Sequence, residues 1–346
     1  MVVIKLLIVV LVIAVGVFYI DIDNWTPFMP NGFGGVMGGV SAVFFAYIGF
    51  DAVSTLAEES KDPQRDLPKG MIYSLVICTV LYIILALVLT GMVPYTALGV
   101  TDPLAEIFAL KGVKWMLFIV SIAAVVAMTS VMLVFQLGQP RIWMTMSRDG
   151  LMPKKFSEIH PKFKTPGFAT IVTGIVVGLP IFFTDETFVL DFTSIGTLFA
   201  FVLVCGGVLL LSPQSEAEVA EAKLRSKFRI PYINSKYIFP LTVMGAAILV
   251  HYFFPDFFIE TLNFSGDAAT TNVTMVLFFL LCIVMAVLAF LKNLSLVPLL
   301  GLVSCCYLLT GMALNNWMWF GLWLALGLVF YFIYGKHNSK LNKQID

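Results

Sequence analysis

The stretch FFAYIGFDAVSTLAEESKDPQRDLPKG, residues Phe44 to Gly70, decides the fold prediction for this chain. Its first half is apolar enough to lie in lipid, yet it places Gly49 and Asp51 in the middle of the apolar run. Its second half is rich in charge and proline and predicts a loop. A glycine weakens a helix, and a carboxylate is expensive to place in hydrocarbon. Together the two residues predict a helix that is broken near Gly49, within the membrane.

The composition of the whole chain indicates an integral membrane protein. Of its 346 residues, 60% are hydrophobic and 12% are charged, and the mean hydropathy is +0.95. A soluble domain carries about 25% charged residues. Lys plus Arg and Asp plus Glu both number 21, so no excess charge points to nucleic acid as a partner. The cysteines and histidines have no catalytic or metal-ligand spacing, so neither an enzyme nor a metal site is expected.

Ten stretches qualify, or nearly qualify, as membrane spans, which take about 17 to 25 mostly apolar residues. They show no alternation at period two, so we interpret them as helices and expect an all-α polytopic membrane protein. The ten predicted spans are Val2–Ile20, Gly34–Leu56, Met71–Met92, Val113–Leu137, Gly167–Phe183, Phe188–Leu211, Ile238–Phe254, Val273–Leu291, Leu294–Ala313 and Trp317–Tyr334.

The placement of basic residues predicts the orientation of the chain. If the first span begins on the inner side, the outer connections contain only Lys111 and Lys114. Nearly all the other Lys and Arg residues fall in inner connections and in the tail, including Lys223, Arg225, Lys227 and Arg229 between the sixth and seventh spans. Cytoplasmic loops carry such an excess. We therefore expect both termini in the cytoplasm and the chain in a bacterial inner or plasma membrane.

The predicted break favours a binding site, although two structural roles remain open. In hydrocarbon every backbone N–H and C=O needs a partner, so a helix is interrupted only where protein, water or a ligand replaces the lost bonds. Exposed helix ends offer amides to an anion and carbonyls to a cation, and an amino acid has both groups. Alternatively, Gly49 is a packing contact and Asp51 an interhelical hydrogen-bond partner. The preceding run GFGGVMGG, residues 32–39, lacks the Lys-Ser/Thr of a phosphate loop and favours close helix packing.

Two segments resemble a known family, the amino acid–polyamine–organocation superfamily in its cationic amino acid transporter branch. Phe44 to Gly70 looks like the sixth transmembrane helix of that branch and the loop after it. The segment MTSVMLVFQLGQPRIWMTMSRDGLMPKKFSEIHPKFKTPG, Met128 to Gly167, is similar to its eighth helix and the following cytoplasmic loop. The resemblance covers most of the chain from Val2 to about Leu211 and continues more weakly to the end.

The resemblance implies a fold of two inverted five-helix repeats. Residues 1–20 would be the last helix of the first repeat, and residues 34–211 would form the complete second repeat. Residues 238–334 would be four additional helices and residues 335–346 a cytoplasmic tail, all within a single membrane domain. The first four helices of the family are missing from this sequence, so we expect a fragment, or a chain that needs a complementary partner to supply them.

The resemblance also implies a substrate site at the break. In the family the unwound part of the sixth helix offers backbone carbonyls to the substrate ammonium, and these positions are Phe45, Ala46, Tyr47, Ile48 and Gly49 here. Phe45 takes the place of an aromatic gate. Asp51 takes the place of a carboxylate implicated in proton linkage or substrate charge. Its alternative role is to cap the half-helix that starts near Ala52.

Three further residues match positions that the family uses for ion coupling. Lys5 lies where proton-coupled relatives carry a lysine on the fifth helix, and a lysine removed from water loses the hydration of its charged form. Alternatively, Lys5 extends to the cytoplasmic interface. Thr129 and Ser130 match hydroxyl positions that line the same ion site, although such hydroxyls also serve as ordinary hydrogen-bond partners between helices.

These observations predict a secondary active transporter that moves amino acids by alternating access, coupled to protons. Its partners would be an amino acid and the lipid bilayer, with no cofactor other than the coupling proton. A channel would need a continuous polar lining, and a membrane enzyme would need paired catalytic groups at depth. Neither is visible. The alternative is a non-transporting fragment, or a subunit of a larger permease.

Overall fold

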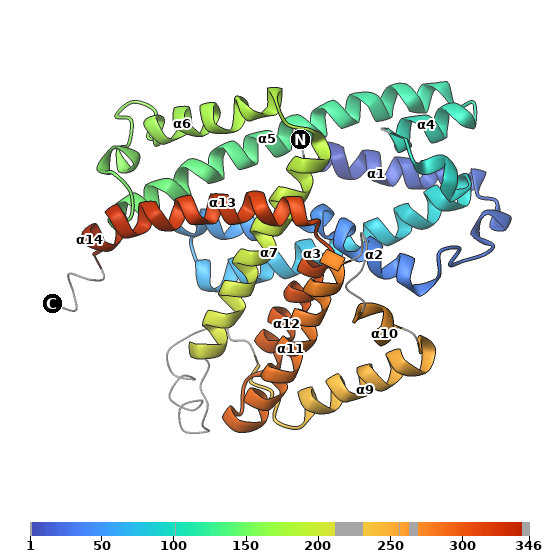
Figure 1. The fold of residues 1–346 in the computed structure, drawn as a ribbon. Helices are drawn as coiled ribbons and strands as arrows, with labels where there is room; N and C mark the ends of the chain where they lie inside the picture. Colours follow the sequence, from blue (N-terminus) through green and yellow to red (C-terminus); the bar gives the residue numbers. More distant parts are fainter. Residues whose placement is uncertain (1, 101, 212–230, 256, 263–268, 341–346) are drawn as a thin grey trace. The chain divides into compact units, whose positions relative to one another are not determined.

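The computed structural model describes residues 2–100, 102–211, 231–255, 257–262 and 269–340, which form helices joined by turns and loops, with no β-strand among them (Figure 1). The basic residues 223–229 and the last six residues, which entered the predictions of orientation and tail, lie outside these ranges. The α-helices are α1 (Val2–Gly16), α2 (Gly32–Phe44), α3 (Pro63–Met92), α4 (Pro103–Leu110), α5 (Lys114–Arg148), α6 (Gly167–Gly178), α7 (Glu186–Leu211), α9 (Ile238–Phe253), α10 (Phe257–Thr261), α11 (Ala269–Lys292), α12 (Leu296–Thr310), α13 (Leu314–Phe330) and α14 (Lys336–Asn338).

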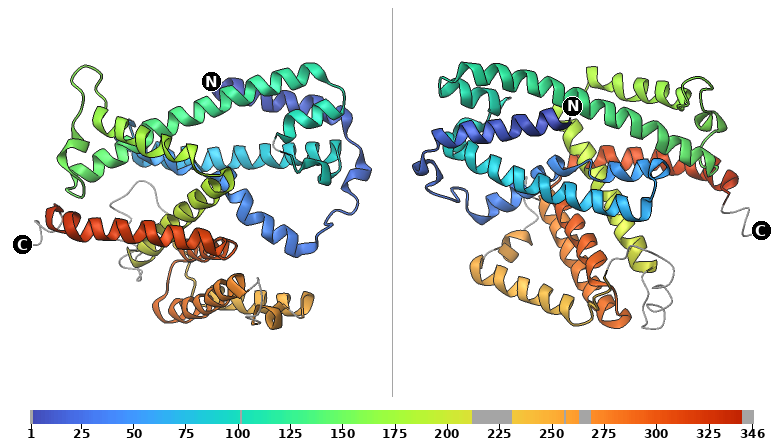
Figure 2. Two further views of the ribbon diagram at one scale, coloured as in Figure 1. Left: turned by 45° about the horizontal axis from the view of Figure 1, so that its top comes forward. Right: turned by 180° about the vertical axis from the view of Figure 1, so that it is seen from behind.

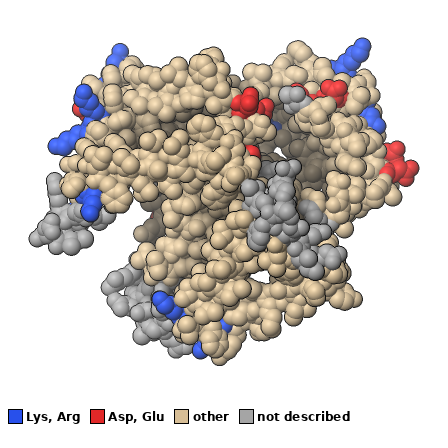
Figure 3. Space-filling view, viewed as in Figure 1, with Lys and Arg blue, Asp and Glu red and all other residues tan. Residues whose placement is uncertain are grey.

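The helices confirm the prediction of an all-α polytopic membrane protein. Seven helical segments of the described chain are long and apolar enough to span a membrane, and three shorter apolar helices accompany them. These ten segments correspond one to one with the ten predicted spans. Their apolar side chains face outward; Val3 of α1, for example, is 68% exposed. On the face seen in Figure 3, residues other than Lys, Arg, Asp and Glu cover most of the surface, as contact with lipid requires.

The chain divides into two compact units. Unit 1 comprises residues 1–36, 49–182 and 331–346, and unit 2 comprises residues 37–48 and 183–330. The chain therefore passes between the units four times, and one passage lies at 48/49, inside the quoted stretch.

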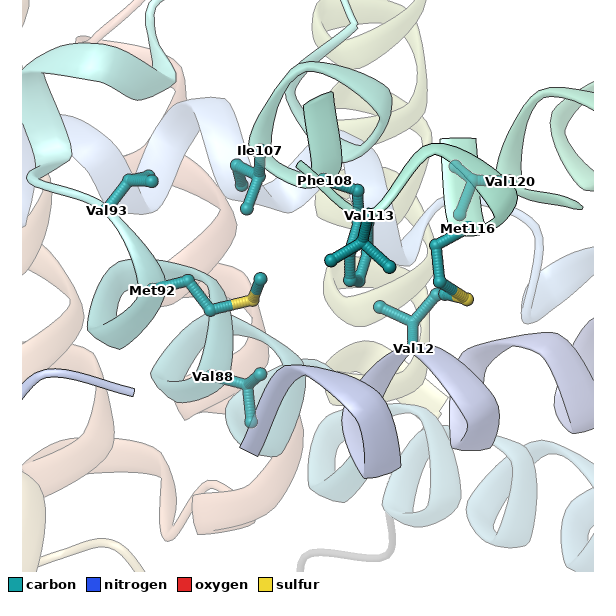
Figure 4. Packing of buried hydrophobic residues seen from close by; sticks show 9 residues of the cluster. All are labelled: Val12, Val88, Met92, Val93, Ile107, Phe108, Val113, Met116 and Val120. Carbon is teal, nitrogen blue, oxygen red and sulfur yellow. The ribbon is translucent and has the colours of Figure 1, made fainter. Parts of the chain in front are cut away.

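The core of unit 1 joins α1, α3, α4 and α5. Its buried side chains converge in Figure 4, with Val12 of α1 below Met116 and Val120 of α5. Gly16 of α1 lies against Val88 of α3, and a Cβ at Gly16 would collide with that valine. The remaining members of this core are Val88, Met92, Val93, Ile107, Phe108 and Val113.

Two apolar clusters hold unit 2 together, and both include residues of α7 and α12. In one, Ile195 and Leu198 of α7 meet Leu309 of α12 and Phe320 of α13. In the other, Leu209 of α7 packs with residues of α9, α11 and α12. The helices α7 and α12 approach closely because Gly301 leaves room for the Cys205 thiol, which a Cβ there would meet at 3.0 Å.

Two helices extend further than the apolar runs predicted. The charged segment before Gly70 was predicted to be a loop, but α3 already begins at Pro63, a residue that suits the first position of a helix. Similarly, α5 was expected to end near Leu137 and instead continues through Pro140 to Arg148. Apolar runs mark where lipid ends, whereas a helix continues into water until a stop signal. For α5 that signal is Gly150, whose φ is +85°.

Candidate substrate site

The helix of the quoted stretch is broken where the sequence predicted. Helix α2 ends at Phe44 and tightens into a 3-10 turn, η3 (Phe45–Tyr47). Ile48 is extended, with φ −60° and ψ 133°. Gly49 has φ +116°, a backbone conformation that residues with a Cβ rarely adopt. A second 3-10 segment, η4 (Asp51–Glu59), follows. The main chain therefore changes direction between Ile48 and Phe50 inside an apolar segment.

Asp51 supplies the hydrogen bond that the backbone loses at this break. Its Oδ1 accepts from the Gly49 N–H at an N···O distance of 3.2 Å, and the side chain is half-buried. This contact faces backward to Gly49 and not forward into η4, so it is not the cap of the following half-helix that was the alternative for Asp51. The carboxylate thus stabilises the left-handed glycine by satisfying its amide.

The carbonyls of the broken segment differ in how they are used. The Phe45 carbonyl accepts from the Ile48 N–H at 3.1 Å, and the Gly49 carbonyl accepts from the Ala52 N–H at 3.1 Å. No hydrogen bond to the Ile48 carbonyl occurs among the residues that the structure describes. Of the five carbonyls proposed from the resemblance, Ile48 therefore offers an open acceptor at the point where the helix is interrupted.

Two adjacent phenylalanines at the end of α2 have different surroundings. Phe44 packs into the cluster of α7, α12 and α13, and its ring meets that of Phe201 edge-on at 6.3 Å. Phe45 is 38% exposed. Phe44 thus anchors the broken segment on α7 within unit 2, and Phe45 remains the accessible ring of the two.

Gly49 and η4, which follow the extended Ile48, pack against α5 within unit 1. A Cβ at Gly49 would lie 3.9 Å from Cζ of Phe135, and one at Gly138 would lie 3.4 Å from Oγ1 of Thr55 in η4. The Thr55 hydroxyl itself donates to the Ala52 carbonyl at 2.7 Å. Within unit 1, the segment after the break therefore lies against α5.

Lys5, Thr129 and Ser130 lie on two helices that pack together in unit 1. Helices α1 and α5 run antiparallel, side by side, in all three ribbon views (Figures 1 and 2).

The surroundings of these three residues differ. Lys5 is half-buried, and Ser130 is buried with 7% of its surface exposed. Thr129 is exposed and donates to the Val125 carbonyl of its own helix at 2.8 Å. The described residues include no ion-pair partner for Lys5. The structure therefore places the three residues on one pair of packed helices.

Two polar contacts inside the apolar helices were missed by the sequence prediction. The Asn316 amide of α13 donates to Oδ2 of Asp191 in α7 at 2.8 Å. The Gln136 amide of α5 donates to the Thr170 carbonyl of α6 at 3.2 Å. The signal was present in the sequence, since Asp191 and Gln136 both lie within predicted spans, where polar groups are expensive and need partners. Each contact fixes two helices of one unit to each other.

The most prominent hollow in the described chain is apolar. It is lined by side chains of α10, α11 and the residue after α10: Phe258, Thr261, Leu262, Val276, Phe279, Leu280 and Ile283. No charged side chain lines it, and no residue of the broken helix contributes to it. This hollow suits hydrocarbon rather than a zwitterion.

Comparison with known proteins identifies the family. A family model described as amino acid permease matches residues 1–281, and one for the C-terminus of such permeases matches residues 294–339. The Branched-chain amino acid permease BcaP of Bacillus subtilis is 34% identical over 344 residues, which cover 99% of this chain and 60% of that protein. The Methylthioribose transporter of the same organism is 33% identical over 98% of the chain and 59% of its own length.

A plant relative is more similar over a shorter stretch. The chloroplastic Cationic amino acid transporter 9 of Arabidopsis thaliana is 52% identical over 157 residues, which are 45% of this chain and 28% of that transporter. The chain thus spans about three fifths of the length of the two bacterial relatives. These relatives are transporters rather than enzymes. The chain belongs to the amino acid permease family of the amino acid–polyamine–organocation superfamily.

Proposed function

We propose that this chain forms the substrate-translocating core of a secondary active permease for amino acids. The observation that carries the proposal is the break at Ile48 to Phe50, which leaves an open carbonyl at Ile48, three residues after an accessible ring, Phe45. An ammonium group can donate to that carbonyl while Phe45 covers the bound solute. The substrate then passes across the membrane as the protein opens first to one side and then to the other.

We assign the coupling of this transport to protons and place it at Lys5, Thr129 and Ser130. Lys5 is a half-buried cation in the apolar helix α1, and α1 packs against α5, which carries the two hydroxyls. At the break, the Asp51 carboxylate supports the Gly49 amide and is a further candidate for coupling.

The substrate class rests on the relatives. Two of the relatives carry amino acids by name, one with branched and one with cationic side chains, whereas another carries methylthioribose. The broken segment itself is mainly apolar. We therefore propose a neutral or cationic amino acid, recognised through its ammonium and carboxylate groups. We also propose that both termini lie in the cytoplasm, with residues 34–211 as one five-helix repeat.

A second candidate function follows from the coverage of the relatives. Because the chain spans about three fifths of their length, the substrate site can require further helices from another segment or chain. In that case this chain binds and transports only together with the complementary helices.

Reconstitution in liposomes tests both candidates. The chain alone, and the chain joined to the first four helices that the family resemblance implies, are compared for uptake of leucine, arginine and methylthioribose with and without a proton gradient. Gradient-dependent uptake of an amino acid by the chain alone supports the first candidate, and uptake by the joined protein alone supports the second. Uptake of methylthioribose alone, or of none of the three, contradicts the proposed substrate class.

A further inference from the structure

The C-terminal segment of the chain lies on the turn that ends α5. After α13 the chain forms one π-helical turn, η8 (Tyr331–Gly335), then α14, and reaches Lys340. The Lys340 N–H donates to the Asp149 carbonyl at 3.0 Å, and both residues belong to unit 1. This bond joins residues 191 positions apart, so the contact is not a consequence of local chain geometry.

Two residues of the segment, four positions apart, are buried, and the residues between them are exposed. Gly335 and Ser339 are buried, Ser339 with 8% of its surface exposed, whereas Lys336, His337 and Lys340 are exposed. The Ser339 N–H is held by the Gly335 carbonyl at 2.9 Å, which turns the serine inward.

The receiving turn is shaped for this segment. A Cβ built on Gly150 would collide with the backbone carbonyl of Asn338, so only glycine lets the segment approach. On the other side, a Cβ at Gly335 would lie 3.6 Å from the Leu151 side chain. The turn satisfies its own amides, since Asp149, Gly150 and Leu151 donate to Thr145, Ser147 and Met146. The Asp149 carbonyl of the turn accepts the hydrogen bond from the Lys340 N–H of the segment.

We propose that residues 335–340 are an autoinhibitory latch whose docking site is the turn Asp149–Leu151 at the end of α5. The occupant is this chain's own C-terminal segment. The docked segment holds the end of the helix that carries Thr129 and Ser130, and it joins that end to α13 through unbroken chain. The proposal rests on the proposed function in one respect, since inhibition means slower transport.

The contact is weak enough to release. Its backbone part is the hydrogen bond from the Lys340 N–H to the Asp149 carbonyl, and Ser339 is buried beside it. One such bond shifts an equilibrium by about three- to tenfold. Contacts of this strength open locally without unfolding the protein. If transport requires the end of α5 to move away from the segment, releasing the latch speeds that step by a similar factor.

Cysteine accessibility tests the docking directly. Ser339→Cys and His337→Cys stand two residues apart on the same segment, one buried and one exposed, and the parental protein gives the background from its own cysteines. With a small maleimide we expect Ser339→Cys to react at least about tenfold more slowly than His337→Cys, as burial slows modification through local opening. Equal rates would overturn the proposal.

Two glycines provide a matched pair of variants. Gly150 and Gly112 both have positive φ, +85° and +73°, but Gly112 has nothing within 4 Å of its Cβ position. Gly150→Ala should raise the reactivity of Ser339→Cys to that of His337→Cys, whereas Gly112→Ala, which carries the same backbone strain, should leave it slow. Protection that survives Gly150→Ala would show that the turn is not the docking site.

Transport then tests inhibition. The variants are made in whichever of the two reconstituted proteins takes up substrate. Gly150→Ala and removal of residues 336–346 should each raise the maximal uptake rate about three- to tenfold and leave the apparent KM within about twofold. Gly112→Ala should leave the maximal rate as it is. A rate that is unchanged or lower in both released variants overturns the latch. If the parental protein takes up nothing, the proposed function fails, while the labelling rates still decide the docking.

Discussion

Of two apolar helices that both contain helix-disfavouring residues, α5 stays continuous and the helix of the quoted stretch breaks. Helix α5 continues for 35 residues although Gly138 and Pro140 lie within it. The other helix ends at Phe44 and resumes as a 3-10 segment at Asp51. The difference lies in what replaces the lost backbone bond. Beside Gly49 a carboxylate accepts from the freed amide. Pro140 has no N–H that needs a partner, and α5 continues past it to Arg148. A break in lipid thus needs a substitute acceptor, and that is the role of Asp51.

The largest effect is expected from Gly49→Ala. A side chain at φ +116° is strained by about 1–3 kcal/mol, although its Cβ would meet only Phe135 Cζ at 3.9 Å. We expect substrate uptake to fall by about tenfold or more as the strain straightens the break. Gly138→Ala in the continuous helix is the control and should change uptake little. Equal losses in the two variants would mean that the broken and continuous helices do not differ in the way described.

The next largest effect separates the two phenylalanines at the end of α2. Phe45→Ala should weaken substrate affinity about three- to tenfold, as expected for the loss of one aromatic contact, and leave the melting temperature nearly unchanged. Phe44→Ala should mainly lower the melting temperature, because Phe44 packs against the α7 cluster. Binding isotherms and thermal unfolding of both variants check this division. If Phe45→Ala binds substrate as the parent does, the ring is not a gate.

A smaller effect tests the substitute acceptor. Asp51→Ala removes the bond to the Gly49 N–H and should destabilise the protein by about 1 kcal/mol, seen in thermal unfolding. Asp51→Asn keeps an acceptor oxygen and should retain most of that stability. If Asp51→Asn is stable but loses the pH dependence of uptake, the carboxylate also takes part in proton coupling. Equal stability of the Ala variant and the parent would remove Asp51 from the account of the break.

The smallest effect on the folded protein is expected at Lys5. Lys5→Ala should leave thermal unfolding nearly unchanged and flatten the dependence of uptake on pH across neutrality. Lys5→Arg keeps a cation that reaches the interface but does not release its proton, so it should flatten the profile too. A normal pH profile in Lys5→Arg would indicate that Lys5 serves only as an interfacial cation.

The sequence predicted the helical fold and the position of the break because both depend on local composition. Seven of the ten apolar runs form helical segments long enough to span a membrane, the other three are shorter, and Gly49 with Asp51 stands out within one of the long ones. The predicted start of α3 and the predicted end of α5 were wrong, because hydropathy marks the lipid boundary and not the end of a helix. The helices begin at Pro63 and end at Arg148.

The remaining details of the site depend on contacts that one sequence does not specify. That Asp51 reaches back to Gly49 depends on the φ angle of that glycine. That Phe44 rather than Phe45 packs on α7 depends on the rotation of α2 about its axis. The pairing of Asp191 with Asn316 joins positions 125 residues apart, and only the packing of α7 with α13 brings them together.

The central claim is that the main chain is interrupted between Ile48 and Phe50 in the membrane. Solid-state NMR of the protein in bilayers, with carbon and nitrogen labels on these residues and on Phe135 to Gln139, measures the backbone angles of both helices. The account predicts an extended Ile48, a positive φ at Gly49 and helical shifts across the α5 residues. Helical shifts running without interruption from Phe44 to Thr55 would contradict it.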